Sequence, residues 1–392
     1  MERSQGRGDG TGLHDLAANR GPSEYAAIST MTDPVELTSN LVRLASVSLS
    51  TGQQDVFDLV AAEMGAAGFD ITEDAAIPRR YLLTTSPHPG PVLLFACHAD
   101  TVPGGNTKQW TRHPFSGEVD DERIHGRGAS DMKGGLAAAV TALATAAAYP
   151  GSVSCGLLLT ADEEIGCLGA AAAVAAGALA NVPLGAVIIP ESTANEIRLG
   201  HRGALWLSLT AHGQAAHGSM PELGRNALLT LARALTDIDA RLPRPGSDHL
   251  GTTSVNVATM SAGQATNIVP DLASASIDIR YVESGQPDSI RAWLAREHPG
   301  IVLTTNRQLS PILADGDDPW IRTLPARLTG HPAPYFTDAS ALLPALAGTP
   351  LVIWGPGQPE RAHAINEYVE ARNVRRAAHL YGQVLDAWRR GS

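Results

Sequence analysis

Cysteine is scarce in this sequence. Only Cys97, Cys155 and Cys167 occur among 392 residues, and no two of them form a CxxC motif. Three widely spaced cysteines cannot all pair, so the sequence offers neither a disulfide framework nor the cysteine-rich ligand set of a structural zinc site. We therefore expect a protein of a reducing compartment, the cytoplasm.

Long apolar segments and basic clusters are also missing. No uninterrupted apolar run is long enough to cross a bilayer. Residues 1–31 are polar and glycine-rich and lack the apolar core of a secretory signal, so we predict a flexible extension there. The net charge of -11, with no lysine or arginine run, argues against nucleic acid or a membrane surface as a partner.

What the chain does contain is a regular alternation of two patterns. Short apolar runs at "PVLLFA", "VSCGLLLT" and "GAVIIP" predict buried strands, and helical patterns separate them. From about residue 310 we expect a helix around "DPWIRTLPARLTG", a strand at "PLVIWG" and a long C-terminal helix from about residue 370. This alternation is typical of an α/β domain whose sheet is covered by helices.

The middle of the chain follows a different order. Between "RGALWLSLTAHG" and "IVLTTNRQ" the patterns read strand, helix, strand, strand, helix, strand. That order is a ferredoxin-like α+β unit. We predict a large α/β domain, residues 32–197 and 310–392, with a mixed sheet flanked by helices, and a smaller domain inserted at residues 198–309.

Polar residues stand where several of the predicted strands end. His98 and Asp100 follow an apolar run in "LLFACHADTVP", and their spacing of two places both on one side of an extended chain. Asp131 lies in the glycine-rich "GRGASDMKGG" just before a predicted helix. Taken alone, the first pair could be structural and Asp131 could cap the helix.

Acidic residues close two further strands. Glu163 and Glu164 end "LLLTADEEIG", and Glu191 follows "GAVIIP". If the strands are parallel, all these groups open on the carboxyl edge of one sheet, where α/β folds bind their ligands. Buried carboxylates repel one another, and no basic cluster stands nearby in the sequence to compensate them. One or two bound divalent cations would compensate these charges.

A second imidazole completes the candidate set. His363 lies in "RAHAINEYVE", after the predicted strand and turn "LVIWGPG". Mixed nitrogen and oxygen ligands favour zinc, with cobalt or manganese as possible substitutes. Two adjacent ions need a bridging group, and a carboxylate such as that of Asp131 is suited to this task.

Five ordered motifs resemble those of the M20 metallopeptidases and deacylases: "HADTVP", "GRGASDMKGG", "TADEEIG", "PEST" and "AHAINEYV". The resemblance covers about residues 32 to 390. The sequence departs from the usual family pattern at Cys97, where a glycine is common, and around Glu191, where "PEST" replaces Gly-Glu-Pro-Thr. Neither change removes a predicted ligand.

The resemblance implies a role for each motif. Two zinc ions would be bridged by Asp131; one would also be held by His98 and Glu191, and the other by Glu164 and His363. Glu163 would be the general base that takes a proton from metal-bound water as it attacks an amide, and Asp100 would orient His98.

The resemblance also implies a homodimer and a substrate pocket. His217 matches a histidine that reaches the active site of the partner subunit, from a domain that serves in dimerisation or as a lid. Substrate contacts would come from Asn267, Arg280, Arg202, Thr337 and Gly355. Each also has an ordinary alternative, such as a surface histidine, a structural ion pair or a simple turn.

The motif details favour an acetylornithine deacetylase-like enzyme, which removes the acyl group from an N-acyl amino acid. A succinyl-diaminopimelate desuccinylase-like enzyme is the first alternative, followed by an M20 dipeptidase or carboxypeptidase acting on short peptides. Outside enzymes, a hydrolase that has lost its activity and only binds metal and ligand is a further alternative, because a fold alone does not prove function.

Overall fold

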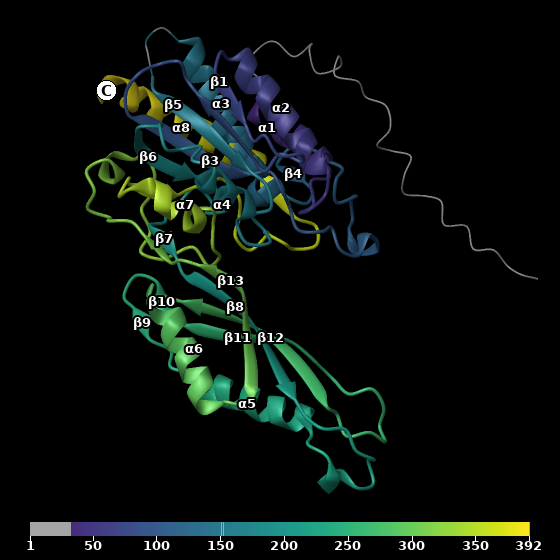
Figure 1. The fold of residues 1–392 in the computed structure, drawn as a ribbon. Coiled ribbons are helices and arrows are strands. Elements are labelled where there is room, and N and C mark those ends of the chain that lie inside the picture. Colours follow the sequence, from purple (N-terminus) through teal and green to yellow (C-terminus); the bar gives the residue numbers. More distant parts are fainter. Residues whose placement is uncertain (1–32, 150, 152, 392) are drawn as a thin grey trace, which may run out of the picture.

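The computed structural model describes residues 33–149, 151 and 153–391. Its chain forms two lobes, each built on its own sheet (Figure 1). The predicted N-terminal extension lies outside the described residues. Because helices cover a mixed sheet in the larger lobe, the predicted α/β class is confirmed.

The large sheet has the strand order β1-β2-β5-β3-β6-β15. Strands β5, β3, β6 and β15 are parallel, whereas β1 and β2 are antiparallel additions at one edge. Strand β3 is buried along its whole length, as expected for a central strand. The strands span Asp70–Glu73 (β1), Tyr81–Thr85 (β2), Val92–His98 (β3), Cys155–Thr160 (β5), Leu184–Ile189 (β6) and Leu351–Ile353 (β15).

Helices cover both faces of this sheet (Figure 1). Four of them pack into one apolar core: α1 (Pro34–Arg43), α2 (Gly52–Ala66), α3 (Gly134–Ala148) and α8 (Ala371–Gly391). Two others pack on the opposite side, α4 (Leu168–Ala175) and α7 (Ala339–Leu346). Helix α1 begins at Pro34, where the Asp33 carboxylate accepts a hydrogen bond from the amide of Val35 at 3.0 Å.

The smaller lobe has an antiparallel sheet in the order β11-β12-β8-β13. In chain order its elements alternate as strand, helix, strand, strand, helix, strand. They are β8 (Gly203–His212), α5 (Ala227–Arg241), β11 (Ser254–Ala262), β12 (Leu272–Tyr281), α6 (Gln286–Glu297) and β13 (Ile301–Leu309). Both helices pack with this sheet in a core of their own. The exact division of the chain at residues 198 and 310 stays a prediction.

Short elements complete the described chain. Three two-stranded ladders pair β4 (Arg123–His125) with β16 (Tyr368–Glu370), β7 (Gly200–His201) with β14 (Ile312–Leu313), and β9 (Gly246–Ser247) with β10 (Gly251–Thr252). The short helices are η2 (Thr107–Gln109), η3 (Ala129–Lys133), η4 (Pro221–Leu223) and η5 (Ile321–Thr323). None of the described helices combines the length and apolar character that a membrane span requires.

The helix expected around "DPWIRTLPARLTG" is wrong. Only the three-residue turn η5 forms there, and the chain leaves helical geometry at Leu324. Pro325 follows directly, and a proline disfavours the helical conformation in the residue before it. The apolar residues whose spacing suggested a helix are buried instead: Ile321 and Leu324 both pack into the main core.

Candidate metal centre

The candidate ligands meet at the carboxyl edge of the parallel strands. His98 is the last residue of β3, Glu163 and Glu164 follow β5, and Glu191 follows β6. Asp131 lies in η3, ahead of α3, where the Asp131–Met132 peptide is cis. Parallel strands end on the same edge of a sheet, so side chains distant in sequence converge there.

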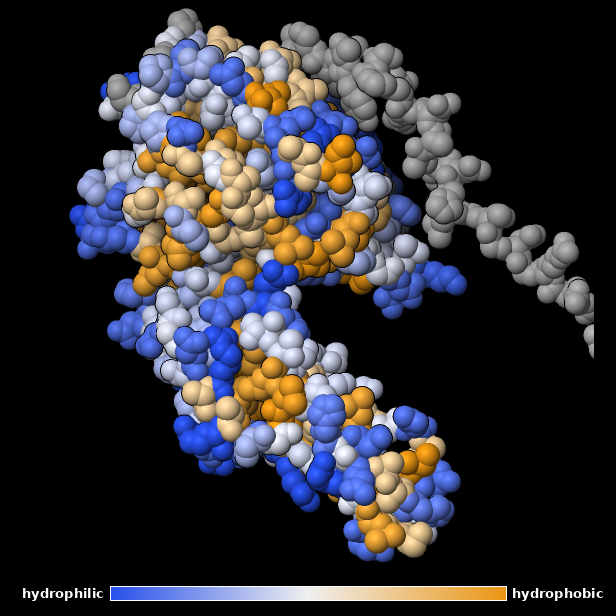
Figure 2. Space-filling view, viewed as in Figure 1, coloured by the Kyte–Doolittle hydropathy of each residue, from blue (hydrophilic) through white to orange (hydrophobic). Residues whose placement is uncertain are grey.

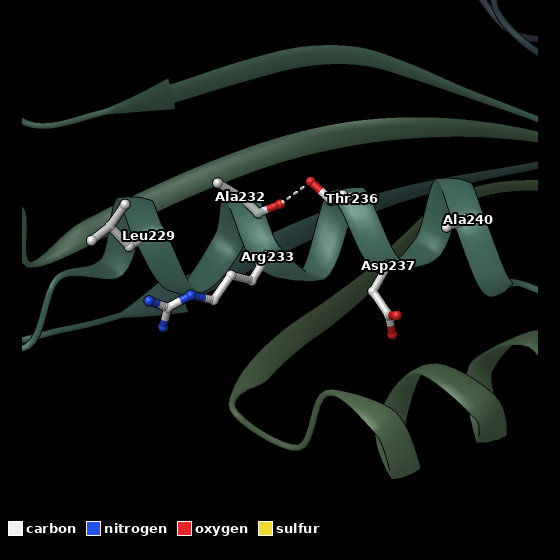
Figure 3. Close-up of a pocket in the computed structure, with 6 residues that line it drawn as sticks. All are labelled: Leu229, Ala232, Arg233, Thr236, Asp237 and Ala240. Atoms are coloured by element: carbon white, nitrogen blue, oxygen red, sulfur yellow. Dashed lines mark hydrogen bonds between the residues drawn. The ribbon is translucent and has the colours of Figure 1, made fainter.

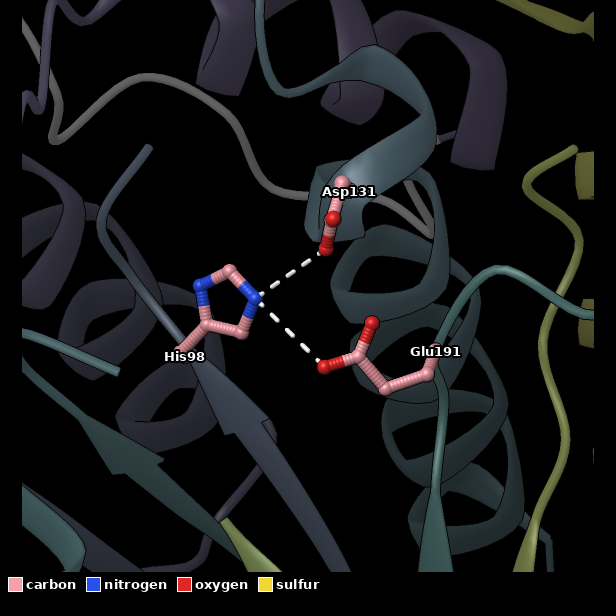
Figure 4. Close-up of side chains that lie close together, drawn as sticks. All are labelled: His98, Asp131 and Glu191. Atoms are coloured by element: carbon pink, nitrogen blue, oxygen red, sulfur yellow. Dashed lines mark hydrogen bonds and ion pairs between the residues drawn. The ribbon is translucent and has the colours of Figure 1, made fainter. Parts of the chain in front are cut away.

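The first ligand group combines His98, Asp131 and Glu191 (Figure 4). His98 Nε2 lies 3.3 Å from Asp131 Oδ1 and 3.6 Å from Glu191 Oε1. The three side chains come from β3, from η3 and from the loop after β6, and they point toward one another. All three residues are buried.

The second group combines Asp131, Glu164 and His363. His363 Nε2 lies 2.9 Å from Glu164 Oε2 and 3.4 Å from Asp131 Oδ2. Asp131 therefore belongs to both groups and presents a different oxygen to each imidazole. This is the arrangement expected of a carboxylate that bridges two ions.

Burial makes this cluster electrostatically costly without a cation. It raises the pKa of Glu191 well above its usual range, and the Asp131 charge adds to the effect. It raises the pKa of Glu164 as well, again with Asp131 contributing. The hydrogen bond with Glu164 raises the pKa of His363 to about 9. Within the described part of the chain, no lysine or arginine forms an ion pair with Asp131, Glu164 or Glu191.

The donor chemistry of the two groups fits divalent metal ions. In each group the candidate ligand atoms lie within 4.8 Å of one another, and each group offers one imidazole nitrogen and two carboxylate oxygens. That mixed set suits zinc, cobalt or manganese better than magnesium or calcium, which prefer oxygen alone. Three protein ligands also leave a position open for water or substrate, as at catalytic zinc sites.

Asp100 contacts His98 and also the loop that carries Glu163 and Glu164. The backbone oxygen of Asp100 is 3.0 Å from His98 Nδ1, and its carboxylate Oδ1 is 3.5 Å from the same nitrogen. The carboxylate also accepts hydrogen bonds from the backbone amides of Glu163 at 2.9 Å and Glu164 at 3.2 Å, and from the Ser48 hydroxyl at 2.7 Å. Asp100 thus connects the end of β3 to the loop that carries both glutamates.

Glu163 lies beside the ligands without joining either group. Its side chain is buried, and its one hydrogen-bond contact among the described residues is with the Cys167 thiol at 3.8 Å. Burial raises the pKa of Glu163 well above its usual range; His98 opposes the shift, and Glu191 and Asp338 add to it. A carboxyl group in such surroundings is suited to exchanging protons.

His217 and Asn267 are placed together, but not at the metal cluster. The amide of Gly218 donates to the Asn267 carbonyl at 2.7 Å, and His217 forms a β-bridge with Ile268. These contacts join the β8–α5 and β11–β12 connections, which Figure 1 shows at the end of the smaller sheet farther from the large sheet. The single chain therefore does not bring these two predicted residues to the candidate ligands.

The two candidate arginines lie close to each other near the junction of the lobes. Arg280 on β12 pairs with Asp278 at 3.0 Å and stacks over the Phe336 ring at 5.2 Å. Arg202 donates to the Thr252 carbonyl at 2.9 Å. Burial lowers the pKa of Arg202, and the positive charge of Arg280 lowers it further. Two neighbouring cations favour an anionic ligand.

Thr337 and Gly355 lie next to the segments that carry the candidate ligands. The buried Thr337 contacts His201 Nε2 through its hydroxyl at 3.1 Å, and burial lowers the pKa of His201 to about 4. A Cβ at Gly355 would lie 2.4 Å from the Glu191 carbonyl, so only glycine permits this approach. Both positions border the ligand segments, whereas a substrate contact stays a prediction.

Our reading of the sequence missed a buried ion pair under the Asp131 loop. Arg127 and Glu367 lie 2.6 Å apart, and both are almost fully buried. The available signal was their spacing, since each lies four residues from a predicted ligand, Asp131 and His363 respectively. Arg127 stands between two glycines, and Glu367 stands just before β16. Buried charged residues require partners, but the sequence does not show that these two pair with each other.

The molecule is hollowed between the lobes on the face drawn in Figure 2, and both hydrophobic and hydrophilic residues border the hollow. Other depressions lie on the smaller lobe. One of about 390 Å³ follows the outer face of α5, and six side chains of this helix line it (Figure 3). They are Leu229, Ala232, Arg233, Thr236, Asp237 and Ala240. This depression contains neither imidazole nor paired carboxylates and offers no hydrolytic chemistry.

The fold and the two ligand groups are those expected of a metal-dependent hydrolase. The profile of Peptidase family M20/M25/M40 matches residues 94–387, and the chain belongs to that family. It is therefore a hydrolase of amide bonds, as its motifs predicted.

Known proteins resemble this chain over most of its length. Succinyl-diaminopimelate desuccinylase of Cereibacter sphaeroides is 31% identical over 288 residues, covering 71% of this chain and 75% of the relative. The enzyme of the same name from Methylorubrum extorquens is 28% identical, covering 91% and 98%. An M20 family metallo-carboxypeptidase of Sulfolobus solfataricus shares the fold, with a TM-score of 0.77 at 17% identity and coverage of 91% and 99%. A dinuclear metal-binding M20 peptidase of Bacillus subtilis has a TM-score of 0.66 at 14% identity, covering 91% and 97%.

Proposed function

We propose that this protein removes the succinyl group from an N-succinyl amino acid, using two divalent metal ions. The observation that carries the reaction class is the pair of ligand groups sharing Asp131, with Glu163 buried beside them and bound to neither. We expect zinc in both positions, with cobalt or manganese as functional substitutes.

The side chains divide the work. His98 and Glu191 would hold one ion, Glu164 and His363 the other, and Asp131 both. Bound ions of this kind lower the pKa of water and polarise a carbonyl group. Glu163 takes the proton from the attacking water and returns it to the leaving amine. Asp100 keeps His98 and the Glu163 amide in register, since it contacts both.

Two observations support a succinyl rather than an acetyl group. The curated relatives named above are desuccinylases, which favours our first alternative over the acetylornithine deacetylase-like reading. A succinyl group also carries a carboxylate that an acetyl group lacks. Burial and the positive charge of Arg280 lower the pKa of Arg202, and Asp278 opposes the shift. Together the two arginines, one of them paired with Asp278, provide a cationic surface for such a group.

The deciding experiment is a hydrolysis panel with metal-free and zinc-loaded protein. We expect zinc-dependent release of amine from N-succinyl amino acids, with a lower kcat/KM for N-acetyl amino acids and dipeptides. Preference for N-acetyl substrates would restore the acetylornithine deacetylase-like reading, and preference for dipeptides would indicate a peptidase. Tight zinc binding without any hydrolysis would indicate a protein that only binds its ligands.

Arg280→Met tests the carboxylate contact directly. Loss of the guanidinium should raise KM for N-succinyl substrates about tenfold or more, while N-acetyl substrates change little. Arg244→Met is the matched control, because Arg244 forms an exposed pair with Asp239 in the same lobe. Equal effects of Arg280→Met on both substrate classes would remove Arg280 from recognition of the acyl group.

We also propose a homodimer in which His217 of one subunit completes the site of the other. His217 lies in a connection distant from the ligands of its own chain, as Figure 1 shows for that segment, which supports this assignment. The cytoplasm stays our proposed location, and the three free, buried cysteines fit a reducing environment.

A further inference from the structure

A buried ion pair joins the two segments that present Asp131 and His363. Arg127 Nη1 donates to Glu367 Oε2 at 2.6 Å, and the two side chains are 4% and 0% exposed. The residues are 240 positions apart in sequence. Within the same contact region, the Gly126 amide donates to the Glu367 carbonyl at 2.9 Å, so backbone and side chains both connect the segments.

The second oxygen of Glu367 holds the backbone of the shared ligand. Glu367 Oε1 accepts hydrogen bonds from the amides of Ser130 at 2.9 Å and Asp131 at 3.2 Å. Both oxygens of this carboxylate are therefore occupied by donors. None of these contacts uses the Asp131 side chain, which stays directed at His98 and His363.

The second nitrogen of Arg127 holds the backbone of His363. Arg127 Nη2 donates to the His363 carbonyl at 3.2 Å, and the guanidinium also lies 5.3 Å from the centre of the Trp110 ring. His363 needs such support, because its side chain is half-exposed and its φ is 63°, a conformation that residues other than glycine seldom adopt.

We propose that Arg127 and Glu367 are positioning residues that set the distance between the shared ligand Asp131 and the terminal ligand His363. The proposal rests on the proposed two-metal function. One planar guanidinium and one carboxylate connect both ligand backbones in a single chain of hydrogen bonds, from the Asp131 amide through Glu367 and Arg127 to the His363 carbonyl.

A structural explanation alone accounts poorly for this pair. Burying two charges costs several kcal/mol per ion before their attraction offsets it, so buried pairs are weak contributors to stability. Groups that orient metal ligands, by contrast, typically change metal affinity by about 10- to 100-fold when they are removed. The hydrogen bonds of the Arg127 guanidinium and the Glu367 carboxylate end on the Ser130 and Asp131 amides and the His363 carbonyl. This placement matches the orientation of metal ligands.

Cobalt titration of the metal-free full chain tests the proposal, with binding heats and the visible cobalt spectrum as readouts. Arg127→Lys keeps the positive charge but loses the forked contact with His363. We expect it to weaken one of two cobalt sites by about 10- to 100-fold and leave the other unchanged. Glu367→Gln should weaken both sites, because Glu367 holds the amide of the ligand they share.

Asp74→Asn is the matched control. The buried Asp74 carboxylate accepts from Arg80 Nε at 2.6 Å and from the amides of Ala76 and Arg80 at 3.1 and 3.2 Å. Like Glu367, it therefore binds one guanidinium and two backbone amides, although the Arg80 side chain is half-exposed. Its substitution should lower the unfolding temperature without changing cobalt affinity. If Glu367→Gln does not fold, Arg127→Lys decides the question.

The outcomes separate the two proposals. If the wild-type protein binds two cobalt ions and the folded variants bind both ions with the same affinity, the positioning role is overturned. Selective loss of cobalt in the variants supports that role even if no substrate on the panel is hydrolysed, in which case only the proposed reaction fails. Wild-type protein that cannot bind two ions overturns both.

Discussion

Gly135 is the position where one added methyl group should disturb the candidate site most directly. It lies in the first turn of α3, just after the segment that carries Asp131. A Cβ at Gly135 would lie 1.9 Å from the carbonyl oxygen of Pro190, the residue before Glu191. Because that neighbour is backbone, it cannot rotate away, and Gly135→Ala has to push the two ligand segments apart by about 1 Å or more.

Two opposing effects set the expected stability change. Alanine in place of a helical glycine gains about 1 kcal/mol from helix propensity. Overpacking in a close-packed core costs about 1–3 kcal/mol, and a contact this short belongs at the upper end. We expect a net loss of about 2 kcal/mol in the free energy of unfolding. A displacement of about 1 Å at the ligands should also lower turnover by about 100-fold.

Thermal unfolding and cobalt titration of Gly135→Ala measure both effects. Gly382→Ala is the control, because Gly382 lies in α8 with nothing within 4 Å of its added Cβ, and it should gain about 1 kcal/mol of stability with unchanged metal affinity. The reasoning is refuted if the two variants shift the unfolding temperature in the same upward direction and Gly135→Ala binds metal like wild type.

Other expected outcomes test single groups. Glu163→Gln should bind two zinc ions normally but lose about 100- to 10,000-fold in kcat; near-wild-type turnover contradicts its proposed role as the base. His217→Ala should lower kcat with unchanged metal content, and mixed dimers with an Asp131→Asn subunit should show whether it acts across subunits. His201 has a pKa of about 4 when folded, below its unfolded value of about 6.5, so the unfolded state binds the extra proton. Wild type should therefore lose about 3 kcal/mol more stability than His201→Gln as pH falls from 6.5 to 4, and parallel curves contradict this.

Much of the fold could be predicted because local pattern and final packing agree. The apolar run ending at His98 is a buried strand, and Asp33 with Pro34 begins the first helix. The prediction failed around η5, where apolar spacing imitated a helix although Pro325 prevents one. The antiparallel edge strands β1 and β2 were also missed. Strand β1 is exposed at every position and shows no alternation, whereas β2 is buried at four of its five positions but is short.

The sequence by itself determined which residue types stand at the strand ends, and therefore the chemistry of the candidate site. The sequence shows directly that His98, Glu164 and Glu191 follow apolar runs. The family resemblance had already implied that Asp131 is shared and that Glu163 is not a ligand. Only the tertiary structure decided that the ligand atoms of each group lie within 4.8 Å of one another, and that Arg127 meets Glu367 240 residues away. The physical reason is that strand patterns follow from local burial, whereas distances between strand ends depend on sheet order and long-range packing.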